Sequence, residues 1–158
     1  MITIRHRQSG AVILELEGDT LSKAVLMGEY LIHSDLEGLD LSGTNLVCAN
    51  LSGSNLKGCC LKNANLSGAN LTEVDLTGAD LTGAKLAGST FSLTILNDCV
   101  GLHHAVGLER VIHANPSMIN EAAFQFSMGA LSNDFFRKIG LTWSEIGYYR
   151  NLYSQSDN

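Results

Sequence analysis

The sequence is poor in basic residues. Among its 158 residues, 10 lysines and arginines stand against 16 aspartates and glutamates, which gives a formal net charge of -6. Surfaces that bind nucleic acids normally cluster Lys and Arg against the phosphates, so this balance argues against a direct nucleic-acid partner. Apolar residues are not scarce, because they make up 45% of the chain, and a buried core is therefore expected rather than disorder.

Long apolar runs are absent as well. No stretch approaches the roughly 18 apolar residues that a membrane-spanning helix requires, so we expect no membrane association. The first residues carry Arg5, Arg7 and Glu15, and they lack the apolar core and small-residue cleavage site of a signal peptide. The sequence therefore favours a cytoplasmic location.

The cysteines have neither the Cys-x-x-Cys spacing of a metal or redox site nor the density of a disulfide scaffold. The four cysteines are Cys48, Cys59, Cys60 and Cys99. Free thiols in a reducing compartment fit this pattern better than disulfides.

Motifs of common catalytic sites are missing too. The chain contains no Gly-x-Ser-x-Gly, no P-loop and no Gly-x-Gly-x-x-Gly. We expect His103 and His104 to diverge on a strand, and no Cys or carboxylate lies at zinc-finger spacing from them. The prediction is a protein without catalytic residues, metal or cofactor, and a small enzyme built on His103, His104 and Cys99 is the least favoured alternative. The remaining histidines, expected to be solvated or packed in a cap, are His6, His33 and His113.

What the chain does contain is a period of five. Large apolar residues stand at sixteen consecutive positions from Leu21 to Leu96, and all are leucine except Phe91. A small residue usually stands two positions before each of them, and Asp or Asn often stands directly before. Residues 49–53 and 64–68 both read Ala-Asn-Leu-Ser-Gly, which is the full unit.

Neither a helix nor a flat strand places every fifth residue on one face, so the chain must turn a corner in each unit. If each unit forms one side of a square coil, four units make a twenty-residue coil in which each leucine stacks on the leucine twenty positions away. The small residue also points inward, whereas Asp, Asn, Ser, Thr and Gly occupy the corners and the outer wall. On this assignment Cys59 lies in the core and Cys60 is an exposed thiol.

The unit Ala-[Asp/Asn]-Leu-x-x resembles the signature of pentapeptide-repeat proteins over about half of the chain. This resemblance implies a mainly β fold, a right-handed quadrilateral β-helix of about four coils and about 19 Å in height. We expect residues 1–18 to form a β-hairpin cap, residues 19–98 the β-helix and residues 99–158 a C-terminal short-helix cap and interaction segment.

The tail carries three sets of helix signals. Asn115–Ser117 is expected to begin a short helix that includes Ile119, Ala123 and Phe126. Two further helices are expected over 132–138 and 142–153, the last with a Thr-x-x-Glu capping box and an apolar stripe of Ile146, Tyr149 and Leu152 or Tyr153. A cap for the solenoid is the favoured role of the tail, and a dedicated docking device is the alternative.

The tail is also similar to a segment that follows pentapeptide arrays in certain bacterial multidomain proteins, often ahead of a TIR-type signalling or defence domain. The residues that carry this likeness are 107–111, 115–119, 134–141 and 145–152. The chain stops where that domain would begin, so the nucleotide-cleaving activity of TIR domains is not carried over.

Two surfaces are candidates for contact with a protein partner. The first is an apolar cluster on the outer wall of the early coils, unless the hairpin or the tail folds over it. Its members are Val25, Met27, Tyr30, Ile32 and Val47. The second is the last predicted helix, which we expect to mediate docking or homodimer formation through its aromatic residues. They are Trp143, Tyr148, Tyr149 and Tyr153.

The sequence therefore favours a non-enzymatic protein interaction scaffold, linked through the tail resemblance to bacterial signalling or defence. The alternative is a DNA-mimic modulator of a type II topoisomerase such as gyrase, a role that some pentapeptide-repeat proteins have. That role requires a long and densely acidic surface. Here the acidic faces around Asp75 and Asp80 are interrupted by Lys57, Lys62 and Lys85.

Overall fold

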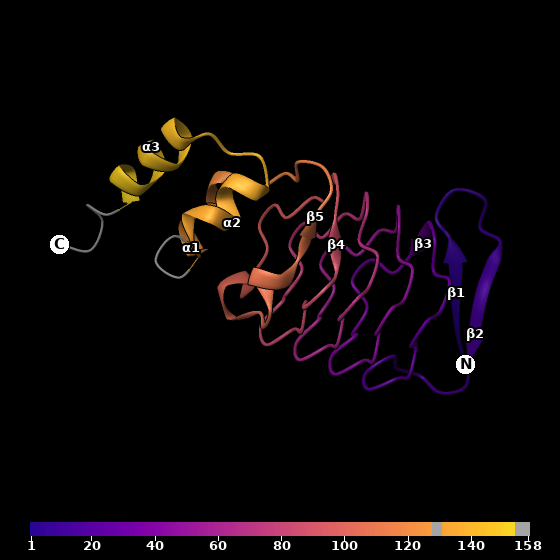
Figure 1. The fold of residues 1–158 in the computed structure, drawn as a ribbon. Coiled ribbons are helices and arrows are strands. Elements are labelled where there is room, and N and C mark those ends of the chain that lie inside the picture. The colour runs from indigo at the N-terminus through magenta and orange to yellow at the C-terminus, as the bar shows by residue number, and fades with distance from the viewer. Residues whose placement is uncertain (128–130, 154–158) are drawn as a thin grey trace.

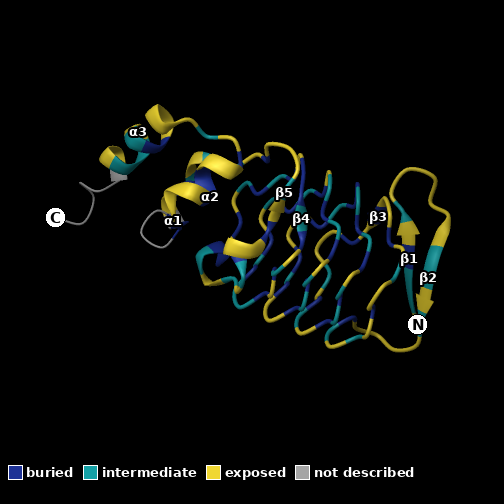
Figure 2. Cartoon of the chain, viewed as in Figure 1, coloured by how far each residue is buried: buried dark blue, intermediate teal, exposed yellow. Residues whose placement is uncertain are grey.

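A computed structural model describes residues 1–127 and 131–153 of the protein (Figure 1). The body is elongated, with a β-hairpin at one end, a stack of coils in the middle and the helices α1, α2 and α3 at the other end (Figure 1). Buried and exposed residues alternate around every coil, so the core runs along the inside of the stack (Figure 2).

The coils repeat every twenty residues. Parallel backbone bridges join Val25 to Asn45 and Asn45 to Asn65, and equivalent bridges run along the other sides of the stack. The leucines from Leu26 to Leu86 donate their N–H groups to the following coil, as Leu26 does to the carbonyl of Asn45 at 2.8 Å. Four pentapeptides thus form each coil of a β-helix solenoid.

The large residues of the period form the core. All sixteen positions from Leu21 to Leu96 are at most 2% exposed, including Phe91. The small residues two positions earlier also point inward, and their polar atoms are satisfied there: the Thr44 hydroxyl donates to the carbonyl oxygen of Leu21 at 2.7 Å. The inward positions predicted from the period of five are confirmed.

Each corner of a coil lies two residues after the leucine. Residues there have a positive φ, which is 70° at Gly78 and 54° at Leu93. Glycine reaches this conformation without steric cost, which explains why it is frequent at this position. The Asp or Asn before the leucine caps the same corner, since Asp75 Oδ1 accepts the backbone N–H of Thr77 at 3.0 Å.

The hairpin closes the first coil. Strand β1 (Ile2–His6) pairs antiparallel with β2 (Val12–Leu16) and also with β3 (Ser34–Asp35), which belongs to the first coil. Ile4 is buried and joins the leucine core. The hairpin therefore covers the apolar end of the stack, where an open coil would expose core leucines.

Parallel pairing continues beyond residue 98, where the sequence had suggested that the solenoid ends. Asp80 pairs with Val100, and strand β4 (Thr90–Phe91) pairs with β5 (Ile112–His113). The last bridge joins Ile95 to Met118, so the spacing between paired residues has grown from 20 to 23. The coiled body therefore includes a fifth coil, over residues 100–118, that no longer follows the period of five.

Two short 3-10 helices take up extra residues of this fifth coil. They are η1 (Leu102–His104) and η2 (Leu108–Arg110), and each follows a glycine with positive φ, Gly101 or Gly107. The insertions destroy the periodicity of the sequence but keep Leu102 and Leu108 directed into the core.

The helices α1 (Glu121–Ser127), α2 (Asn133–Lys138) and α3 (Trp143–Tyr153) follow the fifth coil. The predicted N-cap of α2 is confirmed, because Ser132 Oγ accepts the N–H of Phe135 at 3.1 Å. Apolar residues of α1 and α2 join the leucine core and close its second end, and α3 lies outside them (Figure 1).

The prediction that a helix begins at Asn115–Ser117 is wrong. This segment is not helical, and the N–H of Ser117 donates to the carbonyl of Ile139. Helix α1 starts later, where Asn120 Oδ1 accepts the N–H of Ala123 at 3.0 Å. The backbone of this segment forms its hydrogen bonds with the preceding coil and with the end of α2, instead of forming the helical hydrogen bonds that the sequence signals predict. The Phe126 side chain lies outside the described residues.

Candidate interaction surfaces

The predicted apolar cluster on the early coils lies at the surface, and we call it the first-coil patch. Val25 is 71% exposed and Tyr30 76% exposed, and Met27 and Ile32 are exposed beside them. Val47 is half-buried. The alternative that the hairpin or the tail covers this cluster is wrong for the described residues.

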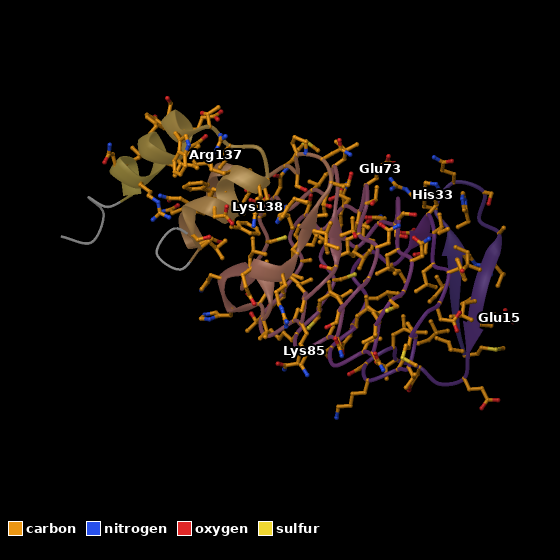
Figure 3. All side chains as sticks on the ribbon, viewed as in Figure 1. Glu15, His33, Glu73, Lys85, Arg137 and Lys138 are labelled. Atoms are coloured by element: carbon orange, nitrogen blue, oxygen red, sulfur yellow. The ribbon has the colours of Figure 1, made fainter. Side chains whose placement is uncertain are left out.

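The patch interrupts a polar wall. The positions paired with Val25 in the next three coils are Asn45, Asn65 and Lys85, and the same column ends in the fifth coil at Val106, which is again apolar and exposed. Glu73 and Lys85 point outward from the coil wall in the same way (Figure 3). Apolar side chains in such exposed positions bury little surface when the chain folds, so a cluster of them indicates a contact surface rather than a contribution to stability.

The second surface is the outer face of α3. Its inner face is anchored: Ile146 is buried, and the Tyr149 ring lies 4.7 Å from the ring of Phe124 between centroids. Trp143 and Tyr148 are each 63% exposed. The side chain of Tyr153 lies outside the described residues.

Among the described side chains of the stripe expected to face inward, Ile146 and Tyr149 do so, whereas Leu152 is exposed. The helix packs on α1 and α2, outside the part of the cap that meets the last coil (Figure 1). Arg150 fastens it, since Nε donates to Asn133 Oδ1 at 2.7 Å and a terminal nitrogen donates to the carbonyl of Leu131 at 2.9 Å.

The start of α3 is fixed by the predicted capping box. The N–H of Thr142 donates to Glu145 Oε2 at 2.7 Å, and the N–H of Glu145 donates to Thr142 Oγ1 at 3.2 Å. A hydrogen bond from the Thr142 hydroxyl to Glu145 Oε2 at 2.6 Å, together with the one from the Thr142 N–H, holds the pKa of Glu145 below its usual range. The helix is thereby fixed at its first turn, close to the exposed Trp143.

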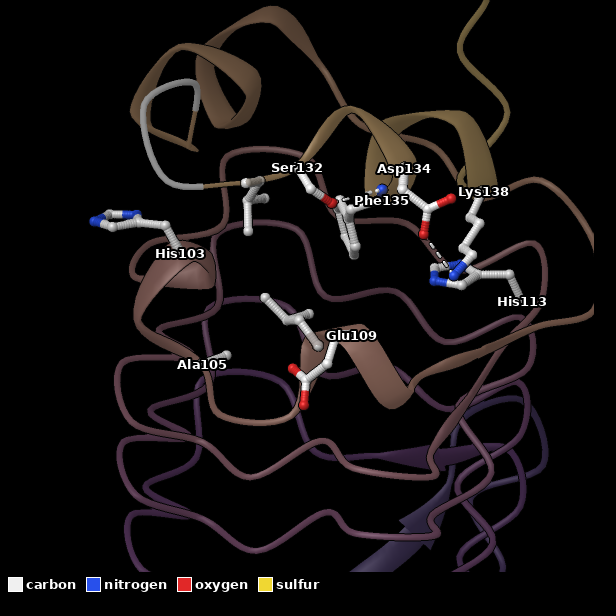
Figure 4. Close-up of a pocket in the computed structure, with 10 residues that line it drawn as sticks. His103, Ala105, Glu109, His113, Ser132, Asp134, Phe135 and Lys138 are labelled. Atoms are coloured by element: carbon white, nitrogen blue, oxygen red, sulfur yellow. Dashed lines mark hydrogen bonds and ion pairs between the residues drawn. The ribbon is translucent and has the colours of Figure 1, made fainter.

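A pocket of about 260 Å³ lies between the fifth coil and α2 (Figure 4). Its wall combines apolar residues with His103, Glu109, His113, Asp134 and Lys138. Asp134 and Lys138 form an ion pair at 2.7 Å. Across residues 1–127 and 131–153 no three metal-ligating side chains come together.

The expectation that His103 and His104 diverge on a strand is wrong. The 3-10 helix η1 sets their ring centroids 4.0 Å apart. His103 nevertheless faces the pocket, whereas His104 is exposed. No sequence pattern predicts this turn, because it accommodates the extra residues of the fifth coil.

The four cysteines are free. Cys59 is buried as predicted, its thiol donates to the carbonyl of Leu36 at 2.9 Å, and burial raises its pKa to about 12. Burial likewise raises the pKa of Cys99 to about 12. Cys60 is half-buried rather than exposed, and Cys48 is exposed.

Ion pairs reduce the negative charge of the acidic faces. Lys57 bonds Asp75 at 3.1 Å, and Lys62 bonds Asp80 at 3.1 Å. Burial alone would raise the pKa of Asp75, but hydrogen bonds from Thr77 and Lys57 hold it below its usual range. Both faces therefore present alternating charges rather than a continuous acidic strip.

A family model for pentapeptide repeats matches residues 21–63 and 59–98, in eight copies. The chain belongs to the pentapeptide-repeat family. The match ends at residue 98, so the likeness of the tail to TIR-linked segments stays a prediction. No match was found among curated proteins.

Solved structures similar to this pentapeptide-repeat protein include one from the thylakoid lumen of Arabidopsis thaliana, with 30% identity, a TM-score of 0.41 and coverage of 51% of this chain and 52% of that one. Rfr23 from the cyanobacterium Cyanothece 51142 has 30% identity and a TM-score of 0.43, with coverage of 57% and 56%. QnrB1, a plasmid-mediated fluoroquinolone resistance protein, has 13% identity and a TM-score of 0.26, with coverage of 68% and 61%. The chain thus spans about half the length of the first two.

The helices of the described residues are all too short or too polar to cross a membrane.

Proposed function

We propose that this pentapeptide-repeat protein is a non-enzymatic scaffold that binds a protein partner through the outer face of α3. The observation that carries the proposal is the exposure of Trp143 and Tyr148 on a helix whose other face is fastened to the body. Aromatic side chains of this kind supply much of the binding energy of protein interfaces. The first-coil patch is proposed as a second contact.

Rigid attachment favours binding by α3. The capping box and the contacts of Arg150 hold the helix before any partner arrives, so little ordering entropy is lost on association. Tyr148 and Leu152 are four residues apart, and both are exposed, so they form one apolar strip along the helix. We propose that a second copy of the chain binds this strip, which gives a homodimer formed through α3.

The test compares sedimentation of the wild-type chain with Tyr148→Ser and Trp143→Ser variants. Both variants should shift the protein towards monomer, because they remove apolar area from the proposed interface. Val100→Ser is the control, since it removes an exposed apolar side chain that lies outside both proposed contacts. A monomeric wild-type chain at all concentrations, together with partner capture that survives both α3 substitutions, would refute the role of α3.

The alternative role as a DNA mimic for a type II topoisomerase requires a strip of uncompensated negative charge. The ion pairs of Lys57 and Lys62 argue against such a strip. A gyrase supercoiling assay separates the two roles. We expect no inhibition and no quinolone protection at micromolar protein, and clear inhibition would reverse the ranking.

The link to bacterial signalling or defence and the cytoplasmic location are parts of the same proposal. The tail resemblance supports the first, and the free thiols support the second. Recovery of the chain with a TIR-domain protein from its source cells, and its absence from secreted fractions, would support both.

A further inference from the structure

His113 of β5 lies where the solenoid meets the helices that close it. Its ring meets Phe91 of β4 edge to face at 5.8 Å between centroids, and Phe135 of α2 edge to face at 5.6 Å. Phe91 belongs to the leucine stack, and Phe135 belongs to the helical cap, which we define as residues 121–127 and 131–153. The half-buried imidazole of His113 thus contacts one aromatic ring on each side of the joint between the leucine stack and the helical cap.

Both ring nitrogens of His113 are buried, and neither has a hydrogen-bond partner among the described residues. A neutral imidazole tolerates this position at the cost of unmade hydrogen bonds. An imidazolium would place a charge and two unpaired N–H donors there, which costs considerably more. The closed joint therefore favours the neutral form of the His113 ring.

The charged groups around the joint do not compensate an imidazolium well. From α2, Lys138 repels it, and Asp134 is already paired with Lys138 (Figure 4). From η2, Glu109 lines the pocket as an exposed carboxylate, and β4 brings no charged side chain. Burial, and then the charge of Lys138, lower the pKa of His113, although Asp134 acts in the opposite direction.

His103 of η1 is the second imidazole in this pocket. Its Nδ1 is buried without a partner in the described part of the chain. Burial, and then the neighbouring His104, lower the pKa of His103. It touches neither Phe91 nor Phe135 in a ring contact of the kind that His113 makes, so it lies beside the joint rather than within it.

We propose that protonation of His113 weakens the joint, so that the helical cap leaves the fifth coil more readily in mildly acidic conditions. Release of α2 lets water reach the imidazolium and uncovers the apolar end of the core at Leu102, Leu108 and Val111. The cap helices have 7, 6 and 11 residues, too short to persist alone, so they unfold when released. Acid thus favours loss of the surface on α3 and exposure of the apolar end of the core.

The direction of the pH dependence follows from proton uptake. The closed joint lowers the pKa of His113 below the ordinary value of about 6.5, which the open state regains. Stability of the cap is therefore complete above about pH 6.5 and falls as the pH decreases towards the pKa of the closed state. Because one proton is taken up, the opening constant rises by at most about tenfold between pH 7.5 and 5.5.

The test follows cap opening by urea titration at these two pH values. Trp143 is the only tryptophan and lies in α3, where Arg137 stacks over its ring at 5.6 Å, so its fluorescence reports the cap. The wild-type cap should open at lower urea at pH 5.5. His113→Phe keeps an aromatic ring in the joint without a titratable group, and it should lose most of this shift. His104→Phe is the matched control, because it removes an exposed imidazole of the same coil and should keep the shift.

A His113→Phe variant with an unchanged pH shift would overturn the proposal, and so would loss of the shift in His103→Phe alone. If His113→Phe fails to fold, the wild-type chain still provides a measurement. An NMR titration should show the imidazole of His113 titrating below pH 6.5 together with loss of the α2 amide signals. Titration at or above 6.5, or without any change in α2, would refute the inference.

Discussion

Replacement of Leu66 by Ala probes the central claim about the core. Leu66 is fully buried, and the twenty-residue register places it between Leu46 and Leu86, with coils on both sides. The surrounding wall is fixed by backbone hydrogen bonds such as that from the Leu66 N–H to the carbonyl of Lys85 at 2.8 Å. The coils therefore have little freedom to collapse onto the space left by the missing side-chain carbons.

The cost of this cavity should lie in the upper part of the usual range for buried Leu→Ala changes, which is roughly 2 to 5 kcal/mol. A chain of this size loses about 2 to 4 °C in melting temperature per kcal/mol, so a fall of roughly 6 to 20 °C is expected. Ser67→Ala is the control, because its half-buried hydroxyl bonds only Asn65 of the same corner. Calorimetry of both variants decides the matter, and equal melting shifts would refute the inward assignment.

Two further predictions concern single sites. Gly101→Ala should destabilise the protein more than Gly58→Ala, although φ is similar at 68° and 62°. A Cβ at Gly101 would lie 2.8 Å from the backbone of Thr82, whereas a Cβ at Gly58 would have nothing within 4 Å. Urea unfolding of the two variants measures the difference, and equal midpoints would contradict the close approach. In the folded protein a thiol reagent at pH 8 should modify Cys48 rapidly and Cys59 only on unfolding, since burial raises the Cys59 pKa to about 12. Mass spectrometry of the labelled peptides checks this order, and early labelling of Cys59 would show that the coils open locally.

The sequence alone determined the body of the fold. The period of five places leucine inward at every unit, and the resemblance to pentapeptide-repeat proteins implies the coil of four units. Each corner is encoded locally by the Asp or Asn before the leucine and the Gly after it. The N-cap at Ser132 and the capping box at Thr142 and Glu145 were also predictable from the sequence, because these hydrogen bonds join residues three positions apart.

The tertiary structure decided what depends on contacts distant in the chain. Residues 100–118 form a coil because the open edge of the previous coil offers backbone partners, and this pairing persists although the inserted 3-10 helices remove the period. The same pairing holds Asn115–Ser117 out of a helix. Packing of α2 against β4 and β5 leaves His113 half-buried between Phe91 and Phe135, and no local pattern distinguishes it from the exposed His104. Hydrophobic burial and backbone pairing act between surfaces that meet only after folding. The end of the solenoid and the burial of its histidines therefore depend on tertiary contacts and not on local sequence patterns.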